Sequence, residues 1–290
     1  MKFLLSTRRK LQIARFVSCG LRAARRIAGR SDRTYAVRGG VRWSLDLAEG
    51  IDLAVYLGVY QKIGKYVAKT VLKPGIVALD IGANVGAFTL PLACQVGNAG
   101  RVIAIEPTVY AFEKLRANLA LNPDLSTRVI AIQVLLGATD EAPNIEGVYS
   151  SWRLSGPSAG VRHPEHGGMR MSITGALCYS IDTLLADDPR LAGLSDRIAF
   201  IKLDVDGHEI DIIRGAQRFL ARNRPAMLIE IAPYVQNERP NGFELLLSEI
   251  SRRGYALYDA EDGTLLPSDP RQIKRLIPYG SGIDVLCLPR

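Results

Sequence analysis

Residues 77–89 read VALDIGANVGAFT, in which an apolar run ends at a carboxylate and two glycines follow, four residues apart. The run predicts a buried strand, and the residues after it predict the start of a helix. Gly82 and Gly86 lack Cβ atoms, so the backbone between the two elements can turn sharply and approach a ligand closely. In an open α/β sheet, ligands bind beside the carboxyl ends of the strands, and this turn is therefore a candidate binding site.

The rest of the chain alternates between short apolar runs and amphipathic segments. Strands are predicted for residues 76–80, 102–106, 129–135, 198–203 and 226–231, and helices for 87–96, 109–121, 209–222 and 243–253. Such an alternation predicts an α/β fold with a mostly parallel sheet that helices cover on both faces. The last predicted strands, 255–258 and 283–288, have no clear helix between them, so one of them is expected to run antiparallel to the rest.

We divide the chain into an N-terminal extension of residues 1–44, which ends with the start of a hairpin, and one α/β domain of residues 45–290. Within the domain, residues 137–180 are rich in Gly, Ser and Pro and show little periodicity. A long insert in a compact domain is often a binding loop or a lid. Residues 141–180 are therefore expected to decide which substrate is bound.

Positive charge is concentrated at the N-terminus. Residues 1–42 contain twelve Lys or Arg and one acidic residue, whereas the remainder contains 25 basic and 28 acidic residues. Apolar residues recur there at spacings of three and four among arginines, which predicts a basic amphipathic helix. Three interpretations stay open: a helix in which residues 1–30 lie on an anionic membrane surface, an organelle transit peptide, and a terminal helix docked on the core. The uneven charge argues against a nucleic-acid-binding face spread over the domain.

Other sequence features restrict the location and the metal content. No apolar run reaches the roughly 18 residues that a membrane-spanning helix needs. The four cysteines are widely spaced and form no C-x-x-C pair, which argues against a zinc site or a disulfide framework and favours a reducing cytoplasm. His163 and His166 have helical metal-ligand spacing, but Pro164 between them predicts a loop. A divalent ion held by Asp204, Asp206 and Glu230 stays an alternative, but we expect no metal.

The turn after Asp80 also restricts the ligand. It matches neither the G-x-G-x-x-G dinucleotide fingerprint nor a P-loop. A carboxylate at Asp80 would repel a pyrophosphate and would suit an ammonium or a hydroxyl group. The second strand ends at Glu106, and an acidic residue at that place binds ribose hydroxyls in dinucleotide folds. A nucleoside with a positively charged amino-acid tail and no phosphate fits both acids, which indicates S-adenosylmethionine as the cofactor.

Three separated segments, LDIGANVGAFTLPLA, GRVIAIEPTVYAFEKLRANLALN and FIKLDVDGHEIDIIRGAQRFL, followed by LIEI, resemble the FkbM family of S-adenosylmethionine-dependent methyltransferases. The resemblance covers residues 45–260. It implies a Rossmann-like seven-stranded sheet and O-methylation of a hydroxyl on a sugar, a glycan or a secondary metabolite. It places the cofactor on Asp80, Gly82, Asn84 and Gly86 in the turn, on Glu106 at the ribose, and beside Pro107, which would direct the chain away from the ribose.

A second polar group of residues, LDVDGHE at 203–209, follows another buried strand. Its strand is expected to neighbour the first one, which would place Asp204 near the methyl donor. His208 titrates near neutrality and is the candidate general base, while Asp204 positions the acceptor or serves as an alternative base. Asp206 is expected to take part in catalysis or to cap the following helix.

Acceptor binding is predicted for Trp152, Ser151 and Glu230. Trp152 and Ser151 lie early in the irregular insert, where the indole would stack on a sugar ring or anchor the loop. Glu230 ends the next strand and is expected to contact the substrate or to cap a loop. Residues 51–61 would pack over the donor site; relatives often end this stretch in Glu, where this chain has Gln61.

Two alternative functions stay open. One is an RNA or protein methyltransferase guided by the basic N-terminus, and the other is a nucleoside-binding protein without catalysis. The N-P-P-Y type of tetrapeptide, which is typical of amino-group methylation, is missing after residues 203–209. A small-molecule or glycan acceptor is therefore expected rather than a nucleic acid, and the sequence does not define an oligomeric state.

Overall fold

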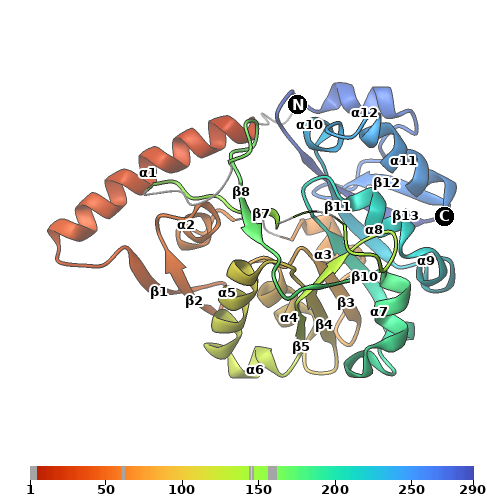
Figure 1. The fold of residues 1–290 in the computed structure, drawn as a ribbon, viewed down its shortest axis with the longest axis horizontal. Helices are drawn as coiled ribbons and strands as arrows, with labels where there is room; N and C mark the ends of the chain where they lie inside the picture. Colours follow the sequence, from red (N-terminus) through yellow and green to blue (C-terminus); the bar gives the residue numbers. More distant parts are fainter. Residues whose placement is uncertain (1–4, 61–62, 144, 146, 156–161) are drawn as a thin grey trace.

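The computed structural model describes residues 5–60, 63–143, 145, 147–155 and 162–290. At its centre lies a seven-stranded sheet with the order β12-β13-β11-β10-β3-β4-β5 (Figure 1). These strands are β3 (Val77–Ile81), β4 (Arg101–Ile105), β5 (Val129–Ile132), β10 (Ile198–Leu203), β11 (Ala226–Ile231), β12 (Tyr255–Asp259) and β13 (Ile283–Pro289). β13 pairs antiparallel with both of its neighbours, β11 and β12, and the other pairs are parallel, which confirms the predicted mostly parallel α/β fold with one reversed strand.

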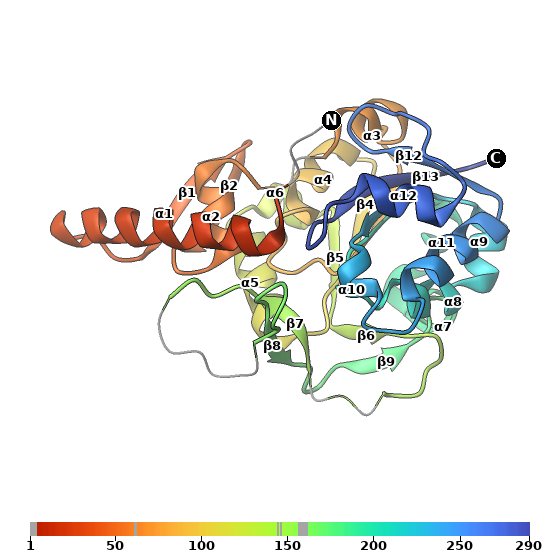
Figure 2. The ribbon, with the colours of Figure 1, turned by 90° about the horizontal axis from the view of Figure 1, so that it is seen from above.

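Helices cover both faces of the sheet (Figures 1 and 2). One face carries α3 (Lys65–Thr70), α4 (Thr89–Val96) and α5 (Val109–Ala120). The other carries α7 (Ile181–Asp187), α8 (Glu209–Arg214), α9 (Gln217–Asn223), α11 (Gly242–Arg252) and α12 (Pro270–Leu276). Successive residues of β3 face opposite helix layers. Ala78 packs in the core beneath α3 and α4, and Leu79 packs in the core beneath α8 and α11. Burial on both faces explains why the strands read as continuous apolar runs.

The predicted helix 209–222 is divided into α8 and α9 at Gly215. At this position the backbone packs directly against the carbonyl oxygen of Gly137, and an added Cβ would lie 2.1 Å from that atom. A close approach between backbones thus interrupts a segment whose apolar spacing alone predicts one helix.

An N-terminal hairpin and helix complete the layer beside α5. The hairpin consists of β1 (Arg33–Arg38) and β2 (Val41–Asp46), and α2 (Gly50–Leu57) follows it. Trp43 and its alternate neighbours in β2 are buried, and the side-chain oxygen of Asn118 in α5 accepts a hydrogen bond of 2.9 Å from the Ser44 N–H. The hairpin therefore packs on the domain, across the boundary that we predict between residues 44 and 45.

The insert contains more regular structure than its composition predicts. β6 (Val134–Leu136) pairs in parallel with β9 (Leu177–Tyr179), and β7 (Gly147–Ser151) pairs antiparallel with β8 (Met169–Ser172). The predicted strand 129–135 is thereby divided between two sheets. These strands are short and pair with each other, so they lack the long apolar runs of the central sheet. Residues 156–161 of the insert and Gln61 lie outside the described residues.

α1 (Thr7–Ile27) lies along the outside of the molecule and extends beyond the sheet (Figures 1 and 2). Two short helices, α6 (Pro123–Ser126) and α10 (Pro233–Gln236), follow α5 and β11. Among the described residues, no helix combines the length and the apolar character that crossing a bilayer would need.

Replacing Gly82 by Ala tests the junction between β3 and β10. Gly82 has a φ of 79°, and an added Cβ would lie 2.0 Å from the carbonyl oxygen of Asp204. We expect the free energy of unfolding to fall by about 3 kcal/mol or more, because backbone strain adds to overpacking. Urea denaturation measures this change. Gly175→Ala is the matched control: Gly175 has a φ of 82° but no atom within 4 Å of the added Cβ, so only about 1 kcal/mol should be lost.

Candidate active site

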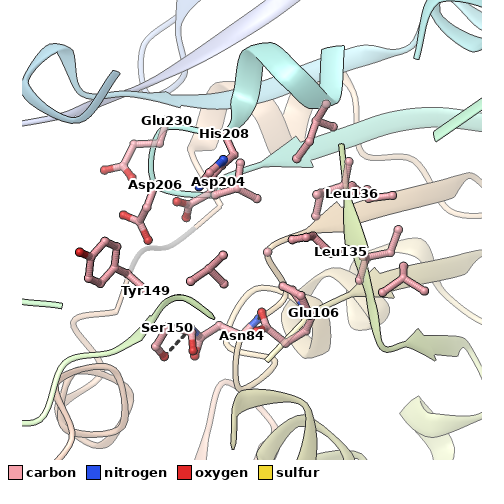
Figure 3. Close-up of a pocket in the computed structure, with 18 of the residues that line it drawn as sticks. Asn84, Glu106, Leu135, Leu136, Tyr149, Ser150, Asp204, Asp206, His208 and Glu230 are labelled. Atoms are coloured by element: carbon pink, nitrogen blue, oxygen red, sulfur yellow. Dashed lines mark hydrogen bonds between the residues drawn. The ribbon is translucent and has the colours of Figure 1, made fainter. Parts of the chain in front are cut away.

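A pocket opens at the carboxyl ends of β3, β4, β10 and β11, on both sides of the point where the strand order changes direction (Figure 3). Its empty volume is about 990 Å³, including the space that is open to solvent. The apolar part of the lining includes Ile105, Val134, Leu135 and Leu136, and the polar part includes Asn84, Glu106, Asp204, Asp206, His208 and Glu230. The predicted cofactor turn and the residues after β10 thus meet in one pocket.

The turn after β3 has a left-handed backbone at three positions, since φ is 79° at Gly82, 48° at Asn84 and 88° at Gly86. Gly82 and Asn84 line the pocket, together with Pro107 from the loop after β4. Gly86 packs inward instead, where an added Cβ would lie 2.7 Å from the Leu115 side chain. The two glycines are therefore needed for packing within the protein, besides any approach to a ligand.

Glu106 lies at the end of β4, beside this turn (Figure 3). One carboxylate oxygen accepts hydrogen bonds from the backbone N–H and the hydroxyl of Thr108, at 3.0 and 2.5 Å, and the other accepts from the Asn84 N–H at 2.9 Å. Burial raises the pKa of Glu106, and the bonds from Thr108 and Asn84 oppose this shift. A carboxylate oxygen has two lone pairs, so the oxygen bonded to Asn84 can accept another hydrogen bond from a ligand hydroxyl.

Asp80 lies behind the pocket and is not among the residues that line it. Its carboxylate accepts a hydrogen bond of 2.6 Å from the Thr89 hydroxyl, and its other oxygen lies 3.8 Å from the ammonium of Lys202. Burial raises the pKa of Asp80, and the Lys202 charge opposes this shift. The ammonium nearest to Asp80 thus belongs to the protein, and a contact between Asp80 and the cofactor stays a prediction.

Lys202 is a site residue that the sequence analysis does not identify. Its side chain is 6% exposed, and its Nζ lies 3.0 Å from a carboxylate oxygen of Asp204. The same ammonium donates a hydrogen bond of 3.3 Å to the Gly82 carbonyl, so it joins the end of β3 to the end of β10. Burial acts to lower the pKa of Lys202, but Asp204 and Asp80 outweigh it and the pKa is raised. A lysine within the apolar run FIKL is the signal that could have identified this buried charge.

Three carboxyl groups face the pocket from the ends of β10 and β11, and we call Asp204, Asp206 and Glu230 the acid cluster (Figure 3). Burial, followed by the charge of Asp204, raises the pKa of Asp206 and that of Glu230 well above their usual range. Carboxylates that lie close together disfavour one another's ionised form, so the acid cluster favours the protonated form of Asp206 and Glu230. Glu209, by contrast, accepts a hydrogen bond from the Gly207 N–H at 3.1 Å and orders the turn.

His208 lies at the rim of the pocket, at the residue before α8 (Figure 3). His208 is exposed to solvent, and partial desolvation by its neighbours lowers the pKa of its ring; Arg239 acts in the same direction, while Asp211 and Glu238 oppose the shift. The lowered pKa favours the neutral imidazole, which can accept a proton.

The insert forms the wall opposite the acid cluster. The Asn84 side-chain amide donates a hydrogen bond of 2.9 Å to the Ser150 carbonyl, and the hydroxyls of Thr108 and Ser150 lie 2.8 Å apart. β7 is thereby bonded to the cofactor turn on one side. Tyr149 of the same strand lines the pocket and lies across from Asp206 (Figure 3).

Glu49 holds the other side of this wall and is a second residue that the sequence analysis does not identify. Its carboxylate accepts hydrogen bonds from the Ser151 hydroxyl at 3.0 and 3.1 Å and from the Trp152 N–H at 3.2 Å. Of the residues predicted to bind the acceptor, Trp152 and Glu230 line the pocket, whereas Ser151 points to Glu49. Ser151 thus contributes to the position of the wall.

His163 and His166 do come together, and their ligand atoms and those of Glu238 lie within 4.8 Å of one another. The two rings stack at 3.8 Å with planes only 8° apart. A metal ion lies close to the plane of each imidazole that binds it, and stacked parallel planes share no such position. In addition, the Nδ1 atoms accept hydrogen bonds from the N–H groups of Glu165 and Gly168, and His163 Nε2 lies 2.5 Å from Glu238. The pair therefore ties the insert to the loop after α10, and the absence of a metal at these residues stays a prediction.

The lining of the pocket fits S-adenosylmethionine. It includes four carboxyl groups, and none of the described lining residues is Lys or Arg. Such a lining attracts a positively charged ligand and repels phosphates. Glu106 has an acceptor available for a ribose hydroxyl, and the neighbouring Ile105 and Leu135 provide apolar surface for an adenine ring.

The sheet order and the pocket fit a Rossmann-like fold with a site for S-adenosylmethionine. A family model described as the methyltransferase FkbM domain matches residues 80–257. The chain belongs to this family, and S-adenosylmethionine is its cofactor. No curated protein matches the chain.

Several solved structures are similar to the chain. The methyltransferase FkbM from Methylobacillus flagellatus KT is 18% identical, with a TM-score of 0.42; the match covers 73% of this chain and 43% of that one. The precorrin-6y C5,15-methyltransferase from Geobacter metallireducens is 12% identical, with 78% and 86% covered and a TM-score of 0.42. TYW2 from M. jannaschii, in complex with AdoMet, is 15% identical, with 89% and 85% covered and a TM-score of 0.40.

Replacing Lys202 by Met tests the junction between the strand ends. The change leaves Asp80 and Asp204 without their nearest ammonium, and we expect a loss of about 3–5 kcal/mol in the free energy of unfolding at neutral pH. The pKa of Asp80 is raised in the folded state, so its ionised carboxylate lowers the free energy of unfolding. This loss of stability grows as pH rises and disappears as pH falls and Asp80 takes up a proton.

Urea denaturation at several pH values measures both effects. The exposed Lys69 provides the control variant Lys69→Met, which should stay within about 0.5 kcal/mol of the parent chain. Equal stability of Lys202→Met and the parent chain at neutral pH would show that the ammonium does not join the strands.

Proposed function

We propose that this methyltransferase transfers the methyl group to an oxygen atom, on a hydroxyl of a sugar, a glycan or a secondary metabolite. The observation that supports O-methylation is that two kinds of proton acceptor, the His208 imidazole and the carboxylates of the acid cluster, lie on one side of the pocket. A hydroxyl must lose its proton as it attacks, and a neutral His208 lies beside the acid cluster at the rim. His208 is the proposed general base.

The methyl donor supplies an electrophilic methyl group on a positively charged sulfur. Glu106 would hold the ribose of the methyl donor, and the turn from Gly82 to Asn84 would hold its amino-acid end. Lys202 keeps Asp204 oriented through the 3.0 Å contact, and Asp204 would in turn orient the acceptor hydroxyl. Asp206 and Glu230 would share a proton at the acceptor and so keep the local negative charge low.

Acceptor binding is proposed for the space between the acid cluster and the insert. Tyr149 and Trp152 provide aromatic surface there, on which the apolar face of a sugar ring can pack. Carboxyl groups can accept hydrogen bonds from several hydroxyls, whereas they repel the phosphates of RNA. A hydroxylated, uncharged acceptor therefore fits this space better than a nucleic acid.

Label transfer from S-adenosylmethionine to matched acceptors tests this function. The panel pairs each sugar, glycolipid or polyketide with an analogue that lacks one hydroxyl. We expect a single hydroxyl of one acceptor to be methylated, and Asp204→Asn to lower kcat/KM by about 10²–10⁴-fold. Asp124→Asn, an exposed acid remote from the pocket, serves as the control. Transfer to an amino acceptor, or unchanged turnover by Asp204→Asn, would contradict the proposal.

The pH profile tests the role of His208. Because the pKa of His208 is lowered, the neutral base increases as pH rises and predominates at a lower pH than in a free imidazole. Turnover should therefore rise with pH on the acidic side and reach a plateau by about pH 7. In His208→Gln this rise should vanish while binding of S-adenosylmethionine, measured by calorimetry, is retained. An unchanged rise in the variant would assign the titration to another group.

A further inference from the structure

α1 has two apolar faces, and only one of them is covered. On the inner face, Leu11, Ala14 and Leu21 pack against a cluster formed by Leu47, Leu53 and Leu154. The hydroxyl of Ser18, on the same face, donates a hydrogen bond of 2.7 Å to the Leu47 carbonyl. This inner face corresponds to the docked terminal helix, one of the three interpretations of the sequence.

Polar contacts along the inner face and at the start of α1 fix its orientation. Thr7 bonds to Tyr234 at 3.0 Å through its hydroxyl and to the Gly280 carbonyl at 2.7 Å through its N–H. Farther along the helix, the Arg22 guanidinium lies 2.7 Å from the carboxylate of Asp32. Since α1 cannot rotate without breaking these contacts, the residues on its opposite side are held toward solvent.

The outer face carries an exposed apolar stripe, which we define as Ile13, Phe16, Gly20, Ala23 and Ile27. Their spacing of three and four places them on one side of the helix over about 21 Å. The side chains of Ile13, Phe16 and Ile27 are 54%, 84% and 90% exposed. α1 extends beyond the sheet in both views, which leaves this face accessible (Figures 1 and 2).

Positive charges flank the stripe. Exposed basic residues on α1 are Arg8, Arg9, Lys10, Arg15 and Arg26, and the helix contains no acidic residue. Arg8 and Arg15 follow the same edge of the stripe, at a spacing of seven. An apolar stripe with a basic edge matches the boundary between acyl chains and anionic headgroups, where the apolar side chains are buried and the guanidinium groups meet phosphates.

We propose that the outer face of α1 binds an anionic membrane surface, with Phe16 and Ile27 inserted at the headgroup boundary. A second copy of the chain fits this face less well, because two stripes in contact would bring two arginine edges together. A nucleic acid would meet the arginines but would leave the aliphatic stripe in water. An anionic membrane is the partner that matches both the positive charge and the apolar surface of this face. The proposal does not depend on which acceptor the enzyme methylates.

Vesicle co-sedimentation of the full chain tests the proposal. Vesicles of phosphatidylcholine are compared with vesicles that also contain phosphatidylserine. We expect binding to the anionic vesicles, and weaker binding as salt is added. The variant Phe16→Ser with Ile27→Ser should lower the binding constant about tenfold or more. Arg8→Gln with Arg15→Gln should lower it about fivefold for each arginine.

Leu265→Ser with Leu276→Ser is the matched control, because both leucines are exposed and lie outside α1. It should bind like the parent chain. The proposal is overturned if the parent chain binds neither vesicle, or if the Phe16 and Ile27 variant binds as tightly as the parent. Two further results would also overturn it. One is that the parent chain forms a dimer which the Phe16 and Ile27 variant dissociates. The other is that the parent chain binds no vesicles but binds RNA, and that the variant binds RNA equally well.

Discussion

The active-site end of the sheet depends on one buried ammonium. Lys202 lies between Asp80 and Asp204 and also donates to the Gly82 carbonyl, so it connects the ends of β3 and β10 through charges that water cannot replace. Gly82 allows the approach, since any side chain there would meet the Asp204 carbonyl. The two paired strands bring the like charges of Asp80 and Asp204 to the same end of the sheet, and the ammonium lies between them.

The sequence predicts the parts of the site that lie within one strand and its turn. Asp80, Gly82 and Glu106 follow apolar runs, and their places at the sheet edge follow from the alternation of strands and helices. Lys202 was missed because a single lysine in a strand is usually read as a solvent-facing position, and its partner Asp80 is 122 residues away in the chain. For the same reason the sequence does not indicate that Asp80 has an ammonium partner within the protein, and its contact with the cofactor stays a prediction.

The insert shows the second limit of sequence-based prediction. Its strands are short, and β6 finds its partner β9 only after about forty residues, so the local pattern carries little information. Ser150 and Trp152 reach the pocket because Glu49 and Asn84 hold β7 from two sides. Neither contact follows from periodicity, since both join segments that are far apart in the chain.

The bond from the Asn84 amide to the Ser150 carbonyl links the cofactor turn to the insert. Grafting the insert of a relative onto this domain would therefore be more than an exchange of loops. The incoming segment would have to present a carbonyl to Asn84, a hydroxyl to Thr108 and hydrogen-bond donors to Glu49. Only sequences that keep these three connections could be recombined without displacing the cofactor turn.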